Sequence, residues 1–310
     1  MSTPALKGPY WATVRQHRHA AWALTALTAA GLAAVAALRL WVGAPPGSDG
    51  PFAFPARAYN LLRLCMEYAG TGLLLLPPLA GAFVAGPMTA RELESGTWRL
   101  ALTQSTTPRA WLGAKVLVAG AVSVVAAAAL VLVYRLGWSR VSSTHQLTWA
   151  DRGPYEATGP VLAAYCLLGV ALGVLVGQLV RRTVAAMAVA GLLTGLVLLG
   201  LGSLRWSFMP TQTSTIPFGD STMRLTPPDS LMTDTGLITS SGARLPEYAC
   251  FERTRNMGDG PADLNVTAWY AEFHPASHYW PTQLIETAVV LALAAAALYA
   301  AFRVLRARRG

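Results

Sequence analysis

Residues Thr89–Lys115 read TARELESGTWRLALTQSTTPRAWLGAK and form a polar stretch between two long apolar runs. The stretch carries two acids, three arginines and a lysine, so it connects two apolar segments and does not continue either of them. Thr89 or Ser95 can cap a short helix here. Glu92 and Glu94 then lie in or near its first turn, where carboxylates are favoured. The sequence therefore predicts a short acidic helix in a tight polar connection, able to insert into a groove of a partner.

The composition of the chain predicts a membrane protein. Hydrophobic residues make up 54% of the 310 residues and charged residues only 13%, whereas water-soluble domains carry about 25% charged residues. A membrane-spanning helix needs about 20 mostly apolar residues, and the predicted class is an all-α polytopic membrane protein with six such helices. The predicted spans are Ala20–Val42, Cys65–Met88, Val116–Leu136, Pro160–Val180, Val184–Leu204 and Leu284–Val304.

The distribution of charge predicts the orientation in the membrane. If the N-terminus is cytoplasmic, the cytoplasmic pieces hold 13 of the 24 lysines and arginines but only two of the 15 acids. Short cytoplasmic loops are enriched in Lys and Arg, so both termini are predicted to be cytoplasmic in a multi-pass protein of the cell membrane. The excess of basic over acidic residues thus reflects the orientation in the membrane and contact with lipid headgroups. No nucleic acid is expected as a partner. The pieces concerned are 1–19, 89–115, 181–183 and 303–310.

Three regions are predicted along the chain. Residues 1–204 comprise an N-terminal segment and the first five spans, and residues 284–310 comprise the sixth span and a basic tail. Between them, residues 205–283 are rich in acids and prolines and hold no apolar run long enough to span, which predicts an external domain. Within the first region, Pro9–Arg18 is either an amphipathic helix in the headgroup layer or an ordinary basic flank.

Glycines and prolines predict how the spans pack. Glycines four residues apart lie on one helix face and let two helix backbones approach closely. The simplest interpretation is the internal seam of a hairpin between the fourth and fifth spans, and the alternative is a subunit interface. In the second span, Pro77-Pro78 predicts a kink or break near mid-membrane. The glycines concerned are Gly169, Gly173 and Gly177 in the fourth span, and Gly191 and Gly195 in the fifth.

Charged residues near the outer ends of spans suggest a gate. Arg39, Glu67 and Glu286 fall close to the predicted outer boundary of the first, second and sixth spans. Charges at such depth are costly and invite a functional explanation. Arg39 could pair with Glu67 or with Glu286 to form a gate or vestibule. The alternative is that each side chain simply reaches the interface on its own.

Other motifs point to no chemistry in this chain. No G-x-x-x-x-G-K-[ST] phosphate loop is present in the sequence, so ATP is not expected to bind by that route. His274 and His278 have a spacing seen in metal sites, but Pro275 disfavours a helical pair, and a solvated loop without metal is the favoured interpretation. The three cysteines show no spacing pattern and are expected to be inert thiols.

The polar stretch resembles a known family. Its string from Glu92 to Thr97, followed by Thr107-Pro108-Arg109 and Lys115, is similar to the first cytoplasmic loop of type-2 ABC exporter permeases. In that family this loop is the coupling helix that docks on the ATPase subunit. The layout of six spans with an external insertion before the last also resembles the family. The resemblance assigns ATPase coupling to Arg91, Glu92, Glu94, Ser95, Gly96 and Thr97.

The resemblance implies a function and partners. It implies the permease subunit of a bacterial ABC exporter, not itself an enzyme, that pairs as a homodimer and binds two copies of a separate ATPase. ATP and Mg²⁺ would then lie on that ATPase, with no cofactor or metal in this chain. The path would be lined by the second and fifth spans and carry an amphipathic drug, antibiotic, peptide or lipid. The alternatives are a membrane sensor or scaffold that binds a ligand through residues 205–283, and an intramembrane enzyme, for which the spans offer no catalytic pair.

Overall fold

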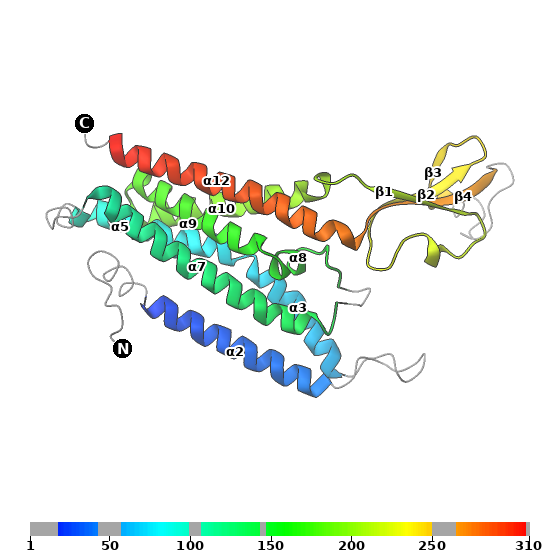
Figure 1. The fold of residues 1–310 in the computed structure, drawn as a ribbon, viewed down its shortest axis with the longest axis horizontal. Coiled ribbons are helices and arrows are strands. Elements are labelled where there is room, and N and C mark those ends of the chain that lie inside the picture. The colour runs from blue at the N-terminus through cyan, green and yellow to red at the C-terminus, as the bar shows by residue number, and fades with distance from the viewer. Residues whose placement is uncertain (1–17, 43–56, 99–106, 143–146, 250–264, 308–310) are drawn as a thin grey trace. The chain divides into compact units, whose positions relative to one another are not determined.

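The computed structural model describes residues 18–42, 57–98, 107–142, 147–249 and 265–307 (Figure 1). The chain divides into two compact units. The first, here called the membrane unit, contains the helices up to Arg205 and the chain from Gln283 onward. The second, here called the β unit, comprises residues 206–282 together with 148–150. Pro9–Arg18, interpreted as either an amphipathic helix or an ordinary basic flank, lies almost wholly outside the described residues, and Cys250 lies outside them too.

Five stretches of the described chain are helical, apolar and long enough to cross a membrane. They correspond to the second to sixth predicted spans, which confirms a multi-pass membrane protein. The first predicted span coincides with α2 (Arg18–Val42), whose apolar part, Thr28–Leu40, is shorter. The other long helices are α7 (Pro108–Trp138), α9 (Val161–Val180), α10 (Thr183–Leu204) and α12 (Tyr279–Ala307).

The second span is interrupted at its two prolines, as the sequence predicts. α3 (Arg57–Leu73) ends before a turn, and the chain resumes as α4 (Leu76–Leu79), the π-helix η1 (Ala80–Ala85) and α5 (Gly86–Glu94). Pro77 and Pro78 fall in the first turn of α4, where a missing backbone N–H costs nothing because that N–H has no partner in the helix. A helix interior could not accept them without a break.

The glycine face of α9 packs against this interrupted span. A side chain on Gly169 would come within 2.5 Å of the Pro77 carbonyl oxygen, and one on Gly173 would come within 2.6 Å of the Ala85 Cβ. Gly177 lies in the same way against Thr89 and Gly86. α9 is correspondingly the most enclosed helix, with 78% of its most apolar window buried, against 22% for α10 and for α12. Through these glycines the second span packs closely against α9. Figure 1 shows α9 at the centre of the membrane unit, between α7 and α10.

The prediction that the α9 glycines pack against α10 is therefore wrong. α9 and α10 do pack side by side, but the α9 glycines face the second span and not α10. Gly191 of α10 also faces that span, at Ala82 and Pro78, while a side chain on Gly195 would meet no atom within 4 Å. The physical reason is that the interrupted span fills the groove that the small residues of both helices leave open.

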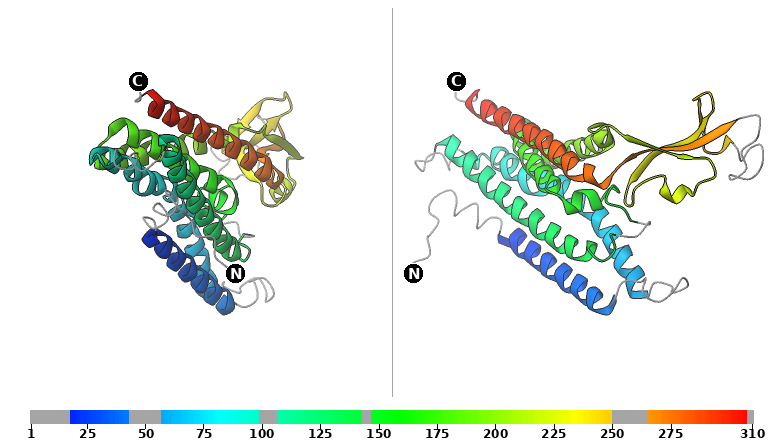
Figure 2. Two further views of the ribbon diagram at one scale, coloured as in Figure 1. Left: turned by 60° about the vertical axis from the view of Figure 1, so that its left-hand side comes forward. Right: turned by 45° about the vertical axis from the view of Figure 1, so that its right-hand side comes forward.

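The β unit contains a four-stranded antiparallel sheet with the order β1-β4-β2-β3 (Figure 2). The alternation of β-branched and aromatic residues in β4, VTAWYAEFH, suits a half-buried pleated strand, and Trp269, Ala271 and Leu237 form the core of the unit. The predicted all-α class therefore holds for the helices of the membrane unit, whereas the segment predicted to be external contains a sheet. The strands are β1 (Gln212–Pro217), β2 (Leu231–Thr239), β3 (Arg244–Pro246) and β4 (Val266–His274).

Two matched glycine substitutions test the packing of α9. Gly173→Ala places a methyl group within 3 Å of three atoms of the second span and is expected to destabilise the protein by about 1–3 kcal/mol. Gly195→Ala enters open space and is expected to leave stability unchanged or to raise it by up to about 1 kcal/mol. Thermal unfolding midpoints in detergent measure both, and equal midpoints for the two variants would contradict the seam.

Candidate functional site

Two polar clusters lie at opposite ends of α10. The helix has 22 residues and is therefore about 33 Å long, close to the roughly 30 Å of a hydrocarbon core. Glu94 contacts its first residue, Thr183, and Arg205 directly follows its last residue. We call these two regions the Glu94 end and the Arg205 end of the membrane unit.

At the Glu94 end, Glu92 ties α5 to α7. The ammonium group of Lys115 donates to Glu92 Oε1 at 2.5 Å and to the Met88 carbonyl oxygen at 2.8 Å. The indole Nε1 of Trp111 donates to Glu92 Oε2 at 3.0 Å. Lys115 is buried, and a buried ammonium is stable only with such partners. The end of α5 is therefore fixed to the first two turns of α7.

Glu94 ties the same helix end to α10. Its Oε2 accepts from the backbone N–H of Thr183 at 2.8 Å and from the Thr183 hydroxyl at 2.5 Å. The first backbone N–H groups of a helix lack partners within the helix, and its N-terminus favours negative charge. The two acids thus bind one helix end to two further helices, α7 through Glu92 and α10 through Glu94.

At the Arg205 end, one guanidinium group is shared by two buried carboxylates. Arg205 donates from Nε to Glu286 Oε2 at 2.7 Å, and from Nη2 to Glu286 Oε1 at 3.0 Å and to Glu156 Oε1 at 2.5 Å. Tyr165 of α9 donates its hydroxyl to Glu286 Oε1 at 2.7 Å, and the guanidinium lies 3.7 Å from the centre of the Tyr155 ring. None of these five residues is more than 1% exposed.

A short helix, α8 (Pro154–Thr158), brings Glu156 to this cluster. Gly153 has φ +97°, and a side chain there would lie 2.8 Å from the backbone of Gly70, so only glycine fits. Glu156 Oε2 accepts from the Gly153 N–H at 3.0 Å, and the side chain of Gln283 donates to the Tyr155 carbonyl oxygen at 2.7 Å. The side chain of Glu156 thus caps the N-terminus of its own helix, α8, and Gln283 hydrogen-bonds α8 to the start of α12.

Comparison with known proteins assigns a family to this arrangement. The model of the family described as ABC-2 membrane transporter related matches residues 19–205. The chain belongs to this family. The match covers more than half of the chain, from α2 to Arg205, so residues 206–282 of the β unit and α12 lie beyond it. No curated protein and no solved structure matched the chain.

Membership in the ABC-2 related family confirms the resemblance seen in the sequence. It places the chain among the membrane components of transporters, and it implies association with an ABC ATPase subunit. The family's membrane components are not themselves catalytic. For this chain the membership agrees with the membrane-length helices found in the structure.

The predicted coupling residues lie in a different local structure from the one expected. Glu92 and Glu94 occupy the last turn of α5, which has no acid in its first turn and does not begin at Thr89. Thr97 and Trp98, the last described residues before residue 107, are helical, so a short helix capped by Ser95 stays a prediction. Arg91, Glu94, Ser95, Gly96 and Thr97 are exposed, and Glu92 is partly buried. Gly96 has φ +71° and turns the chain away from α5, and residues 99–106 lie outside the described part.

The predicted gate pairs are wrong. Arg39 donates to the Leu136 carbonyl oxygen at 2.7 Å, and Glu67 pairs with Arg63 on its own helix at 3.3 Å. Glu286 pairs with Arg205 instead. Arg205 and Glu156 were missed because they fall in segments assigned to external connections. One signal was available for each: Arg205 ends a long apolar run, and Glu156 follows a Gly-Pro pair that starts helices.

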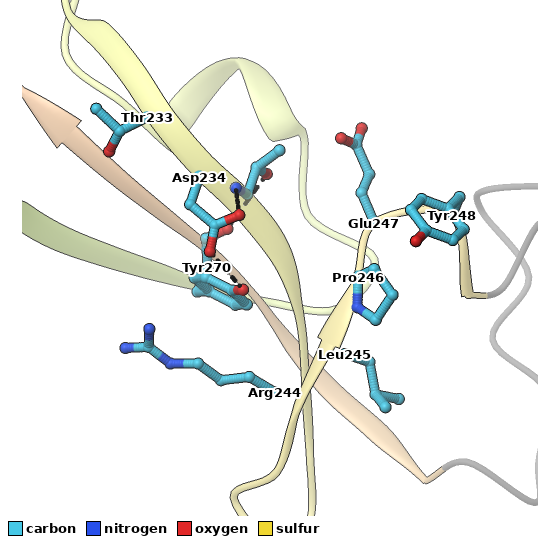
Figure 3. Close-up of a pocket in the computed structure, with 9 residues that line it drawn as sticks. Thr233, Asp234, Arg244, Leu245, Pro246, Glu247, Tyr248 and Tyr270 are labelled. Atoms are coloured by element: carbon cyan, nitrogen blue, oxygen red, sulfur yellow. Dashed lines mark hydrogen bonds between the residues drawn. The ribbon is translucent and has the colours of Figure 1, made fainter. Parts of the chain in front are cut away.

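The β unit carries an open hollow of about 520 Å³ between β2, β3 and the ring of Tyr270 (Figure 3). Tyr270 donates its hydroxyl to Asp234 at 3.0 Å, and Arg244 lies over the Tyr270 ring and pairs with Glu272. Its hydrogen bond to Glu272 raises the pKa of the Arg244 guanidinium. The hollow is thus rimmed by both signs of charge and offers a polar surface.

The histidine pair is buried, which corrects the prediction of a solvated loop. His274 ends β4, His278 lies in the short helix η5 (Ala276–His278), and their Nδ1 atoms are 3.1 Å apart. Trp206 packs against the His274 ring at 5.6 Å. The described chain contains no group of three or more metal-ligating side chains.

The lowered pKa of His274 predicts that the folded protein loses stability in acid. Burial, and then the neighbouring His278, lower the pKa of His274 below its usual 6.5. The unfolded chain therefore binds a proton more readily than the folded one, and the stability that neutral His274 contributes is lost as the pH falls below about 6.5. Thermal midpoints measured between pH 7.5 and 5 should decline for the native chain and decline less for His274→Gln. An equal decline in both would contradict this account.

A double-mutant cycle tests the junction at the Glu94 end. Glu92→Gln and Lys115→Met each break the buried ion pair, and the double variant removes both charges. The expected interaction energy is about 1–3 kcal/mol in unfolding free energy, because either single variant leaves a charge without its partner. Unfolding in detergent measures it, and additive effects of the two substitutions would show that the pair does not hold α5 to α7.

Proposed function

We propose that this chain is the permease subunit of an ATP-driven exporter in a bacterial cell membrane. In this proposal a separate ABC ATPase, which carries ATP and Mg²⁺, docks at the Glu94 end and drives the helices between inward and outward states. Two copies of the chain form the transporter, and the path lies between them, lined by the second span and α10. The cargo is an amphipathic drug, antibiotic, peptide or lipid.

The observation that carries the proposal is the double attachment of α5. Its exposed end is joined to α7 through Glu92 and to α10 through Glu94. If a bound protein displaces the end of α5, α7 and α10 therefore move with it. Through the glycine seam the same motion reaches α9. Rigid, packed helices carry such motion because their cores do not deform continuously.

The charges at the Glu94 end support a cytoplasmic location. The exposed arginines Arg91, Arg181 and Arg182 lie at this end, and so do Arg303 and Arg306 of α12, whose neighbours Ala301 and Phe302 pack with Trp111 and Leu112. Positive residues are enriched on the cytoplasmic side of membrane proteins. The Arg205 end and the β unit would then be external, where the hollow of Figure 3 could meet cargo before or after transport.

Charge reversal at an exposed coupling residue tests the proposal. Arg91 is exposed and flanks the attached acids, so Arg91→Glu should leave the fold intact and weaken binding of the ATPase by about tenfold, the effect of roughly 1.4 kcal/mol. Arg224→Glu, an equally exposed reversal in the β unit, is the matched control. Co-purification from native membranes, followed by ATP hydrolysis and transport in proteoliposomes, measures both.

Two outcomes would overturn the proposal. If no ABC ATPase co-purifies with the native chain, the chain is not such a permease, and ligand binding by the isolated protein would then favour the sensor alternative. If the ATPase binds but Arg91→Glu and Arg224→Glu behave alike, the docking surface lies elsewhere than at the end of α5.

A further inference from the structure

The outer edge of β1 has no partner strand in the described chain. β1 and β3 are the two edge strands of the sheet, and they are protected to different degrees. β3 is only three residues long and contains Arg244 and Pro246, and short length, charge and proline each keep an edge from pairing. β1 is six residues long, and no charged residue occurs between Arg205 and Asp220 in the sequence. The edge of β1 is therefore open to a further strand.

Two residues of β1 direct their backbone groups to this edge. Directly after the strand, the Phe218 N–H donates to the Thr267 carbonyl oxygen at 2.9 Å. Hydrogen bonds alternate along an antiparallel strand, so the even-numbered residues of β1 bond to β4, whereas Thr213 and Thr215 point their N–H and C=O groups away from it. The side chains of both threonines are exposed. Within the described chain their outward N–H and C=O groups have no partner.

A second copy of β1 fits this edge better than an unrelated peptide does. Recognition of a peptide by strand addition needs pockets for its alternate side chains. The hollow of Figure 3, and a second one of about 390 Å³ beside Phe218 and Trp269, include no residue of β1. A peptide would therefore gain backbone bonds without selection of its side chains. Two copies of β1 match each other by two-fold symmetry, and no like charges oppose each other because the strand is uncharged.

We propose that β1 pairs with β1 of a second copy, antiparallel across a two-fold axis at Ser214. Thr213 of each copy lies opposite Thr215 of the other, and each such pair exchanges two N–H···O=C bonds. The two four-stranded sheets then form one continuous sheet. This register uses every free outward group of the strand, because Pro217 has no N–H and its carbonyl oxygen already accepts from the Asp220 N–H at 3.2 Å.

The inference rests on the proposed function, in which two copies of the chain form the transporter, and it names a contact between them. The contact lies in the β unit and needs neither the ATPase nor the cargo. It can therefore be tested on the full chain by itself.

Disulfide formation from single cysteines tests the register. In the proposed pairing the Ser214 residues of the two copies face each other as a non-hydrogen-bonded pair, with Cα atoms about 4.5 Å apart, which a disulfide can bridge. The Gln212 residues lie on the same face of the sheet but four positions out of register, about 14 Å apart along the strands. That separation is beyond the reach of a disulfide, so Gln212→Cys is the matched control.

The variants are made in the full chain with Cys65, Cys166 and Cys250 replaced by alanine and are oxidised mildly in the membranes of the cells that express them. Ser214→Cys is expected to give at least about tenfold more disulfide-linked dimer than Gln212→Cys, because only the first pair of sulfur atoms can meet. Non-reducing gel electrophoresis measures both, and the control reports random encounters between copies.

A proline at the edge gives a second measurement. Thr215→Pro removes one outward N–H and leaves the bonds between β1 and β4 in place, because an edge strand tolerates proline on its free side. Combined with Ser214→Cys it should abolish most of the linked dimer, whereas Thr215→Val keeps the N–H and should retain it. Circular dichroism checks that the folds agree, and if the proline variant does not fold, Ser214→Cys against Gln212→Cys still decides the inference.

Either of two results would overturn the inference. One is an equal yield of linked dimer, or none, from Ser214→Cys and Gln212→Cys. The other is a folded Thr215→Pro variant that links as fully as Thr215→Val.

Native mass spectrometry of the unmodified chain in lipid nanodiscs separates this failure from that of the proposed function. Dimers that form without a Ser214→Cys disulfide would overturn the β1 contact alone, and a purely monomeric chain would overturn the two-copy permease as well. A chain that carries a bound peptide in place of a second copy would assign the edge to that peptide and overturn the inference.

Discussion

The membrane unit depends on the close approach of α9 to an interrupted helix. The glycines of α9 leave room for the backbone of α4, η1 and α5, and the Pro77 carbonyl oxygen of this interrupted span lies directly against Gly169. Inside a membrane the hydrophobic effect does not drive helices together, so van der Waals contact between backbones must do so. α7 and α10 are then positioned around this pair.

The polar groups of the membrane unit are placed at the two ends of that packed centre. At one end Glu92 and Glu94 join three helices, and at the other Arg205 joins α8 and α12 in a fully buried cluster. The β unit is inserted between Arg205 and Gln283 in the chain, so the ion pair between Arg205 and Glu286 closes the base of the insertion. Both ends therefore contain interactions that a change of conformation must rearrange.

The residues of the two clusters show why only part of the site could be predicted from the sequence. Glu92 and Glu94 were identified because acids in a short connection between apolar runs stand out, but their partners Lys115 and Thr183 are set by helix packing. Arg205 and Glu156 are 49 residues apart in the chain and carry no local pattern that pairs them. Arg39 was predicted to pair with Glu67 or with Glu286 from their depth alone, and depth does not say which helices are neighbours.

Length and hydropathy by themselves determined that this chain spans a membrane, where five of its helices lie and that the second is broken at Pro77-Pro78. These are local properties, because a bilayer sets the length of an apolar helix and a missing N–H breaks one. Only the tertiary structure decided that the glycines of α9 face the second span, that residues 205–283 contain a sheet, and which carboxylates share Arg205. Such pairings join distant parts of the chain, and their energy depends on burial and on the geometry of all partners together.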